Sequence, residues 1–234
     1  MARVRVGEAR DWLPIAALDR AIDDRHTNRR AFIGGPVPPG VVHDLVSAAH
    51  SEGGQLLPIT EPSHRTATAE LSRLADQIEE ADPAYQAELW QWTTDDPRRR
   101  DGVQAASVPY VGHFSDAHDT LPIRPFDVRG MGWLPASSEP DGQQCLLLLA
   151  AADDGPQSWL RTGEALERVW LTLTRLGFSA SLLTQVVEAS QTNAKLREAL
   201  STDLHPQILL RVGHAPNTVR SPRLEAADVI SVRS

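Results

Sequence analysis

Arg25-His26-Thr27-Asn28-Arg29-Arg30-Ala31-Phe32 places two arginines four residues apart, with a histidine and a hydroxyl between them. The stretch follows an amphipathic segment and precedes Pro36, Pro38 and Pro39. Guanidinium forks and a hydroxyl suit a phosphate monoester, and backbone N–H groups in an irregular turn add further donors. A second interpretation stays open at this point. The same arginines are the solvated end of a helix, because charge runs usually face water.

Composition limits the classes of protein that the chain fits. It has 234 residues, 41% hydrophobic and 23% charged, which is typical of one large globular domain with a sizeable core. The net charge of −8 argues against a nucleic-acid binder but allows a local basic pocket. No stretch reaches the ~20 apolar residues of a membrane span, and residues 1–7 lack a signal-peptide core. We therefore expect a cytoplasmic protein that binds neither nucleic acid nor membrane.

The single cysteine, Cys145, excludes an internal disulfide and suits a reducing compartment. It lies in the apolar run Cys145–Ala150, so we interpret it as a small core residue and not as a nucleophile.

Hydrophobic periodicity indicates an α+β fold with two buried strands among about six helices. The expected helices are 12–24, 41–49 closed by Gly53-Gly54, 63–81 capped by Ser63, one restarted by Asp82-Pro83, 156–176 ended by Gly177, and 192–200. The expected extended segments are 55–59, 144–151, 181–187, 206–212 and a C-terminal arm, 221–230, that adds an edge strand to a neighbour.

The order of these segments, together with Arg25-His26-Thr27-Asn28-Arg29, resembles the nitroreductase superfamily from about Leu18 to the end. Its R-x-[ST]-x-R/K signature holds the phosphate of flavin mononucleotide (FMN). More specifically, the chain looks like the C-terminal half of the fused, Acg-like proteins of actinobacteria. The resemblance implies a nitroreductase-like α+β fold, with a central mixed sheet flanked by helices in a dimer or pseudo-dimer. It divides the chain into an N-terminal arm, 1–20, and the domain proper, 21–234.

By the same resemblance, the phosphate ligands are Arg25, His26, Thr27 and Arg29. The tail adds Arg223, for which Arg220 is the alternative, and Arg211 ranks behind Arg223. Arg211 has a second interpretation as a surface charge at the end of a strand.

The flavin ring is expected beside Leu182-Leu-Thr184-Gln185, where the family directs a backbone N–H at the flavin N5. The alternative is that Thr184 and Gln185 are ordinary turn residues after a buried strand. No catalytic side chain is needed because the flavin carries the chemistry.

Residues 102–142 have no sustained periodicity and contain five prolines. We expect a lid or a dimer arm, because the family carries an insertion on the active-site side here; a mobile linker is the alternative. His113, Asp116, His118 and Asp119 lie in this insertion without metal-ligand spacing, so no metal site is expected.

These features favour an FMN-dependent oxidoreductase that passes electrons from NAD(P)H to a nitro-aromatic or quinone-like small-molecule acceptor. Residues 51–58 lack the asparagine and tryptophan of the family's Ser-x-x-Asn-x-Gln-Pro-Trp-like segment, although Gln55 matches its glutamine. The alternative is therefore a degenerate protein that binds or sequesters flavin without turnover. A homodimer or a complementary half-domain is the expected partner. A cofactor-free structural protein remains the third interpretation.

Overall fold

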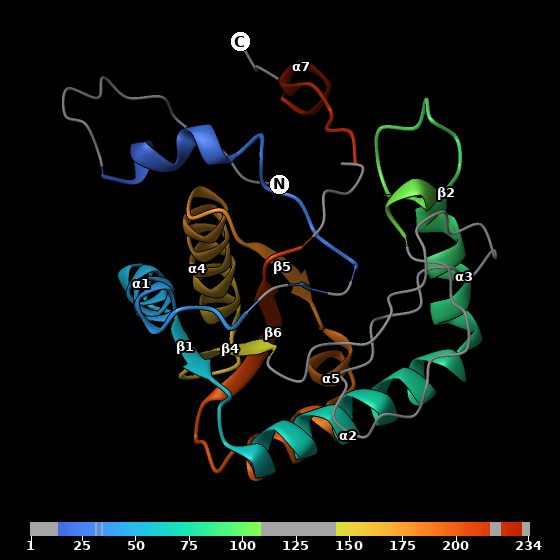
Figure 1. Ribbon diagram of the computed structural model, residues 1–234. Helices are drawn as coiled ribbons and strands as arrows, with labels where there is room; N and C mark the ends of the chain where they lie inside the picture. Colours follow the sequence, from blue (N-terminus) through green and yellow to red (C-terminus); the bar gives the residue numbers. More distant parts are fainter. Residues whose placement is uncertain (1–13, 31, 34, 109–143, 216–220, 231–234) are drawn as a thin grey trace.

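The structure is a computed structural model that describes residues 14–30, 32–33, 35–108, 144–215 and 221–230. Its elements form a sheet flanked by helices, and α3 (Pro83–Trp92) lies to one side of it (Figure 1). In chain order they are η1 Pro14–Ala21, α1 Pro39–Ser51, β1 Gln55–Pro58, α2 Pro62–Glu80, α3 Pro83–Trp92, β2 Thr93–Thr94, β3 Val103–Gln104, η2 Ala105–Ser107, β4 Cys145–Ala151, α4 Pro156–Arg175, β5 Ser179–Leu182, α5 Gln185–Glu188, α6 Ser190–Ala199, β6 His205–Gly213 and α7 Ala226–Val229.

The main sheet has the strand order β1-β4-β6-β5, with antiparallel pairing throughout. The buried apolar run of β4 lies in its interior, where Leu147 pairs with Leu210 of β6. The expected mixed character comes from a parallel bridge between Thr27 and Ala180, which sets the segment after η1 beside the outer strand β5.

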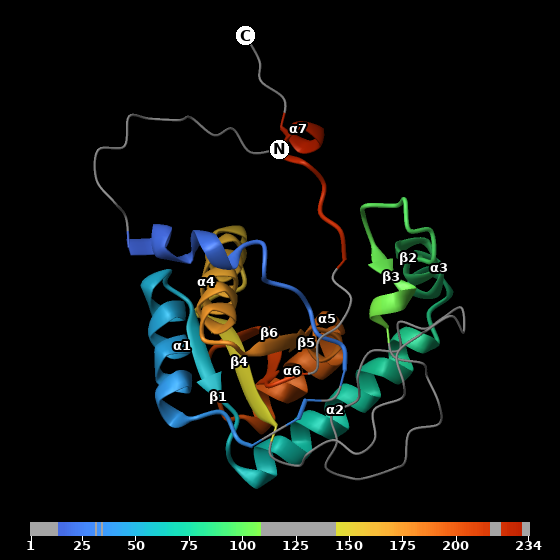
Figure 2. The same ribbon diagram turned by 45° about the horizontal axis from the view of Figure 1, so that its top comes forward.

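Side chains of β4 alternate between two helical layers, because successive residues of a strand point to opposite faces. Leu147 and Leu149 pack with α1 and α4, whereas Leu146 and Leu148 pack toward α2, α5 and α6. The two layers lie on opposite faces of the sheet in both views (Figures 1 and 2). The core therefore has two parts, one on each face of the sheet.

The glycine pair after α1 ends that helix as predicted. Gly53 has φ +78°, a conformation that favours glycine, and its N–H donates to His50 O at 3.0 Å. The Gly54 N–H donates to Ala49 O at 3.0 Å. These two bonds form a Schellman motif, which returns the chain into β1.

Four local predictions need correction. The first helix is the 3₁₀ segment η1, and α2 has Glu61 instead of Ser63 at its N-cap, without a side-chain bond. Residues 181–187 are extended only to Leu182, after which α5 begins. The tail forms the short helix α7 instead of the predicted edge strand. Alanine at 226 and 227 favours a helix, and the Glu225 N–H donates to Asp228 Oδ2 at its start.

The α+β class and the flanked sheet are confirmed. Residues 109–143, most of the expected lid or dimer arm, lie outside the described residues, as do His113, Asp116, His118 and Asp119. Among the helices in the described part of the chain, none has the length and apolarity to cross a membrane.

Candidate functional site

The cationic turn at residues 25–30 is fastened to the edge of the sheet. Its Thr27 forms a parallel bridge with Ala180 of β5, and the Asn28 N–H donates to Ala180 O at 2.9 Å. Ala180 lies two residues before Leu182, where the predicted ring segment begins. The structure therefore brings the predicted phosphate segment and the predicted ring segment to the same strand.

Asn28 shapes this turn from inside, and the sequence reasoning missed it. The residue is 1% exposed, and its Oδ1 accepts the N–H of Arg30 at 2.9 Å. An asparagine that bonds a backbone N–H two residues further on makes a local turn of its own. The sequence contains a signal for this turn, because asparagine is a favoured turn former. The interpretation of Asn28-Arg29-Arg30 considered only the charged residues.

Arg25 lies against α4. Its Nε is 3.2 Å from Glu167 Oε1, and its guanidinium carbon is 4.9 Å from the ring centroid of Trp170. The Nε atom is buried and makes no hydrogen bond, so charge and not an aligned bond holds the pair. Glu167 and Trp170 are one helical turn apart on α4 and contact the same guanidinium.

Arg223 reaches the same turn from the tail. Its Nη2 donates to Ile22 O and to Arg25 O, both at 2.8 Å, and so satisfies carbonyls just after η1. Arg100 in turn donates to Arg223 O and to Glu225 Oε1. The structure thus brings the Arg223 guanidinium to the backbone of Arg25. Arg220 lies outside the described residues.

Arg211 is a buried cation below the turn, not an end-of-strand surface charge. It is 1% exposed on β6, its Nη2 donates to Arg30 O at 2.9 Å, and its guanidinium carbon is 4.6 Å from the Phe32 ring centroid. Burial lowers the pKa of this guanidinium to about 10. Arg211 therefore supports the backbone of the turn from the protein interior.

The other predicted phosphate residues occupy the turn itself. His26 Nδ1 is 2.9 Å from Asp24 O, Thr27 is partly buried, and Arg29 has a buried Nε. Their positions follow from the bridge at Thr27, which fixes the middle of the turn.

The predicted ring segment crosses from β5 to α5. Leu182 ends β5, the Leu183 N–H donates to Leu209 O at 2.9 Å, and Gln185 is 3% exposed. The Gln185 Nε2 donates to Asp76 Oδ1 of α2 at 3.0 Å, so its side chain serves packing between helices. Among the described residues, no backbone acceptor binds the Thr184 or Gln185 N–H.

Cys145 has the properties of a core thiol. Burial raises its pKa to about 11, although the nearby charge of Arg65 acts in the opposite direction.

We expect alkylation of Cys145 by iodoacetamide at pH 8 to be roughly tenfold slower in the folded protein than in the denatured chain. The thiolate population falls about 100-fold, and the higher intrinsic nucleophilicity of a more basic thiolate returns part of that. Mass spectrometry of timed samples measures both rates, and equal rates would mean an activated or freely exposed thiol.

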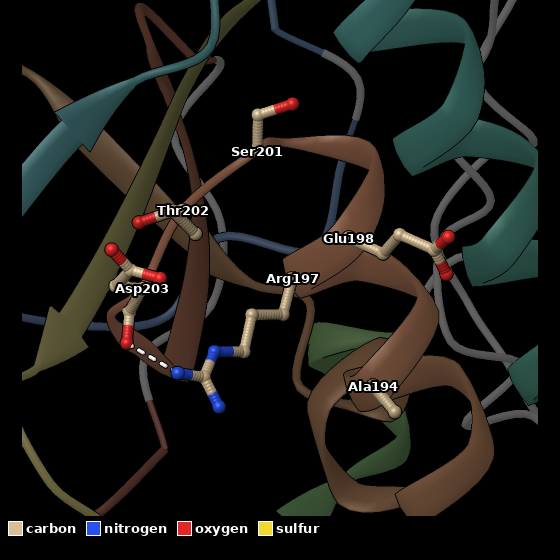
Figure 3. A pocket seen from close by; sticks show the side chains of 6 residues that line it. All are labelled: Ala194, Arg197, Glu198, Ser201, Thr202 and Asp203. Atoms are coloured by element: carbon tan, nitrogen blue, oxygen red, sulfur yellow. Dashed lines mark hydrogen bonds between the residues drawn. The ribbon is translucent and has the colours of Figure 1, made fainter.

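A separate hollow of about 350 Å³ lies at the end of α6 (Figure 3). Its lining is polar, and Arg197 donates to Asp203 O across it. It adjoins the N-terminal end of β6, whereas the turn lies beside Ala180, which pairs with Val212 near the other end. The hollow therefore does not belong to the turn. Its lining residues are Ala194, Arg197, Glu198, Ser201, Thr202 and Asp203.

The described residues contain no group of three or more His, Cys, Asp or Glu side chains that could hold a metal ion. The turn instead carries the guanidinium groups of Arg25 and Arg29 and the Thr27 hydroxyl on one short segment.

No family model matches the chain. The chain is 31% identical over 219 residues to "Putative NAD(P)H nitroreductase MT3217" of Mycobacterium tuberculosis (strain CDC 1551 / Oshkosh). This match covers 92% of the chain and 61% of the relative, so the chain spans about three fifths of that protein's length. An uncharacterized protein of the same organism is 28% identical over 221 residues, which are 92% of the chain and 62% of that relative.

Solved structures share the fold. The FMN and NADPH-dependent nitroreductase NfnB from a Sphigopyxis strain has a TM-score of 0.56 at 16% identity, covering 93% of this chain and 99% of that one. A nitroreductase with bound FMN from Desulfitobacterium hafniense DCB-2 has a TM-score of 0.56 at 12% identity, covering 93% and 98%. The chain is thus similar in sequence to a protein named a putative NAD(P)H nitroreductase, and it shares the fold of solved nitroreductases.

Proposed function

We propose that this chain binds FMN between the turn at residues 25–30 and the segment Leu182–Gln185, as part of an NAD(P)H-dependent oxidoreductase. The acceptor is a nitro-aromatic or quinone-like small molecule. The observation that carries the proposal is the attachment of the turn to β5 through Thr27, Asn28 and Ala180. Ala180, to which the turn is bonded, is within about 14 Å of Thr184, since four extended residues span no more than that.

The donors of the turn fit the phosphate of FMN. A phosphate monoester carries about −1.5 to −2 charges at pH 7 and accepts several charge-assisted hydrogen bonds. Arg25 has a buried Nε that makes no hydrogen bond, Arg29 and the Thr27 hydroxyl follow on the same turn, and the Arg223 guanidinium lies at the Arg25 carbonyl. Arg211 has a different role in this proposal: it holds the backbone at Arg30 and makes no contact with the phosphate.

The bound flavin would supply the hydride and electron chemistry. The chain contributes the backbone N–H groups of Thr184 and Gln185, which bind no backbone acceptor among the described residues. Donors fixed at a strand end can stabilise negative charge that develops on a reduced ring, whatever their side chains are. The buried Gln185 side chain, bonded to Asp76, keeps this segment in place.

The segment at residues 51–58 favours a second chain in the complete site. It ends α1 and forms β1, at the opposite edge of the sheet from β5. Three strand spacings of about 4.8 Å separate those edges, so Gln55 is on the order of 14 Å or more from the flavin site proposed in its own chain. A homodimer or a complementary half-domain would bring such a segment to the ring from outside.

A flavin-binding protein without turnover is the second candidate. It is favoured by residues 51–58, where the asparagine and tryptophan of the family segment are absent. Purified protein, supplied with FMN and then desalted, separates the two candidates by its visible spectrum. Yellow protein that bleaches with NADPH under anaerobic conditions supports the oxidoreductase, and yellow protein that does not bleach supports sequestration. Protein that retains no flavin contradicts both.

A further inference from the structure

Glu167 occupies a position where it competes with an anionic ligand for Arg25. Its Oε1 is 3.2 Å from Arg25 Nε, and the side chains are 50% and 22% exposed for Glu167 and Arg25. The Glu167 carboxylate is therefore half-exposed, whereas the Arg25 Nε is buried and forms no aligned hydrogen bond with it. A partly exposed ion pair without an aligned hydrogen bond contributes little to stability.

Trp170 allows the guanidinium to stay in place when its anionic partner changes. The guanidinium carbon lies 4.9 Å from the ring centroid, and the ring is buried, with 4% of the residue exposed. A cation–π contact of this kind does not use the N–H donors of the arginine. The Trp170 ring and the backbone bond from Arg25 N–H to Ala21 O at 2.9 Å therefore position Arg25 independently of Glu167.

We propose that Glu167 is an internal competitor that weakens phosphate binding at Arg25, so that its carboxylate leaves the guanidinium when a phosphate monoester binds. This inference rests on the proposed function, because it concerns the FMN phosphate. A phosphate carries more charge than a carboxylate and binds a guanidinium fork through two parallel bonds, so it displaces the poorly aligned carboxylate. The exchange sets the affinity of the site for phosphorylated over unphosphorylated flavins.

The test compares Glu167→Gln with Glu164→Gln, which removes the same charge from the same helix at an exposed residue one turn earlier. Each is titrated with FMN and with riboflavin, which lacks the phosphate, and binding is followed by flavin fluorescence. We expect Glu167→Gln to bind FMN about three- to fivefold more tightly than Glu164→Gln does, which is the upper range for an exposed ion pair. Riboflavin affinity should be the same in both variants.

Three results would overturn the inference. Equal or weaker FMN binding by Glu167→Gln means that Glu167 is neutral or that it orients Arg25 for the ligand. An equal gain for riboflavin means that the phosphate is not involved. If neither the wild-type chain nor Glu167→Gln binds FMN, the proposed function itself fails and takes the inference with it. Tighter FMN binding by the variant alone supports the competition.

Discussion

Replacing Arg25 and Arg29 together by alanine should lower the affinity for FMN by about 10²- to 10⁴-fold. Each residue is assigned one or more hydrogen bonds to a charged phosphate, and such bonds contribute roughly 1.5–3 kcal/mol apiece. Flavin content after desalting, together with a fluorescence titration, measures the loss. An unchanged flavin content would remove the phosphate assignment from this turn.

This double substitution should lower the free energy of unfolding only slightly. Arg25 loses a partly exposed ion pair with Glu167 and a contact with Trp170, which together contribute about 1–2 kcal/mol. The matched control is Arg98→Ala with Arg161→Ala, two exposed arginines outside the turn that give the same change in net charge. Both double variants should show the same circular dichroism spectrum as the wild type, and only the turn variant should lose flavin.

A lysine pair at the same two positions separates charge from geometry. Lysine keeps the positive charge but lacks the planar fork that pairs with two phosphate oxygens. Arg25→Lys with Arg29→Lys should therefore retain FMN more weakly than the wild type and more tightly than the alanine pair. If the lysine pair binds as well as the wild type, the site recognises charge alone.

The long, regular segments were predictable from the sequence because their signals are local. β4 is a continuous apolar run, and α4 repeats its apolar residues at helical spacing until Gly177 ends it. The prediction that residues 181–187 are extended was wrong beyond Leu182, because a short apolar run does not distinguish a strand from a helix. Only the neighbouring β6 and α2 decide where β5 stops.

The geometry of the candidate site was predictable only in part. The residue types of the turn at residues 25–30 are visible in sequence, but the bridge from Thr27 to Ala180 joins residues about 150 positions apart, and no local pattern encodes it. The alternative interpretation of Arg211, a surface charge at the end of a strand, followed the rule that charged residues are usually exposed, and the burial of Arg211 contradicts it. Its burial depends on Phe32 and on the Arg30 carbonyl, which the fold brings to it from a distant part of the chain.

Gly54→Ala should destabilise the folded protein by about 1–3 kcal/mol, because it adds an atom to a closely packed core. A Cβ on Gly54 would lie 2.7 Å from Ala165 Cβ and 3.3 Å from Leu149 Cδ1, so α4 would have to move away from the sheet. Both neighbours belong to the buried core, where no flexible side-chain end can swing aside. For a domain of this size the expected loss lowers the melting temperature by roughly 2–4 °C per kcal/mol.

Gly163→Ala is the internal control, because the same atom is added to α4 where nothing lies within 4 Å. Alanine at an exposed helical position should stabilise the protein by about 0.4–1 kcal/mol, through helix propensity and a less flexible unfolded chain. A lower melting temperature for Gly54→Ala and a higher one for Gly163→Ala would establish close packing between α4 and the end of α1. Equal signs would mean that α4 adjusts without cost.

The displacement of α4 in Gly54→Ala should also reach the proposed flavin site. Ala165 is two residues before Glu167 and five before Trp170, the two α4 residues that contact Arg25. We therefore expect Gly54→Ala to weaken FMN binding measurably at a temperature where the variant is fully folded, while Gly163→Ala binds as the wild type does. Unchanged FMN affinity in a destabilised Gly54→Ala protein would show that the Arg25 contact with α4 tolerates movement of the helix, and the phosphate would then depend on the attachment of the turn to β5 alone.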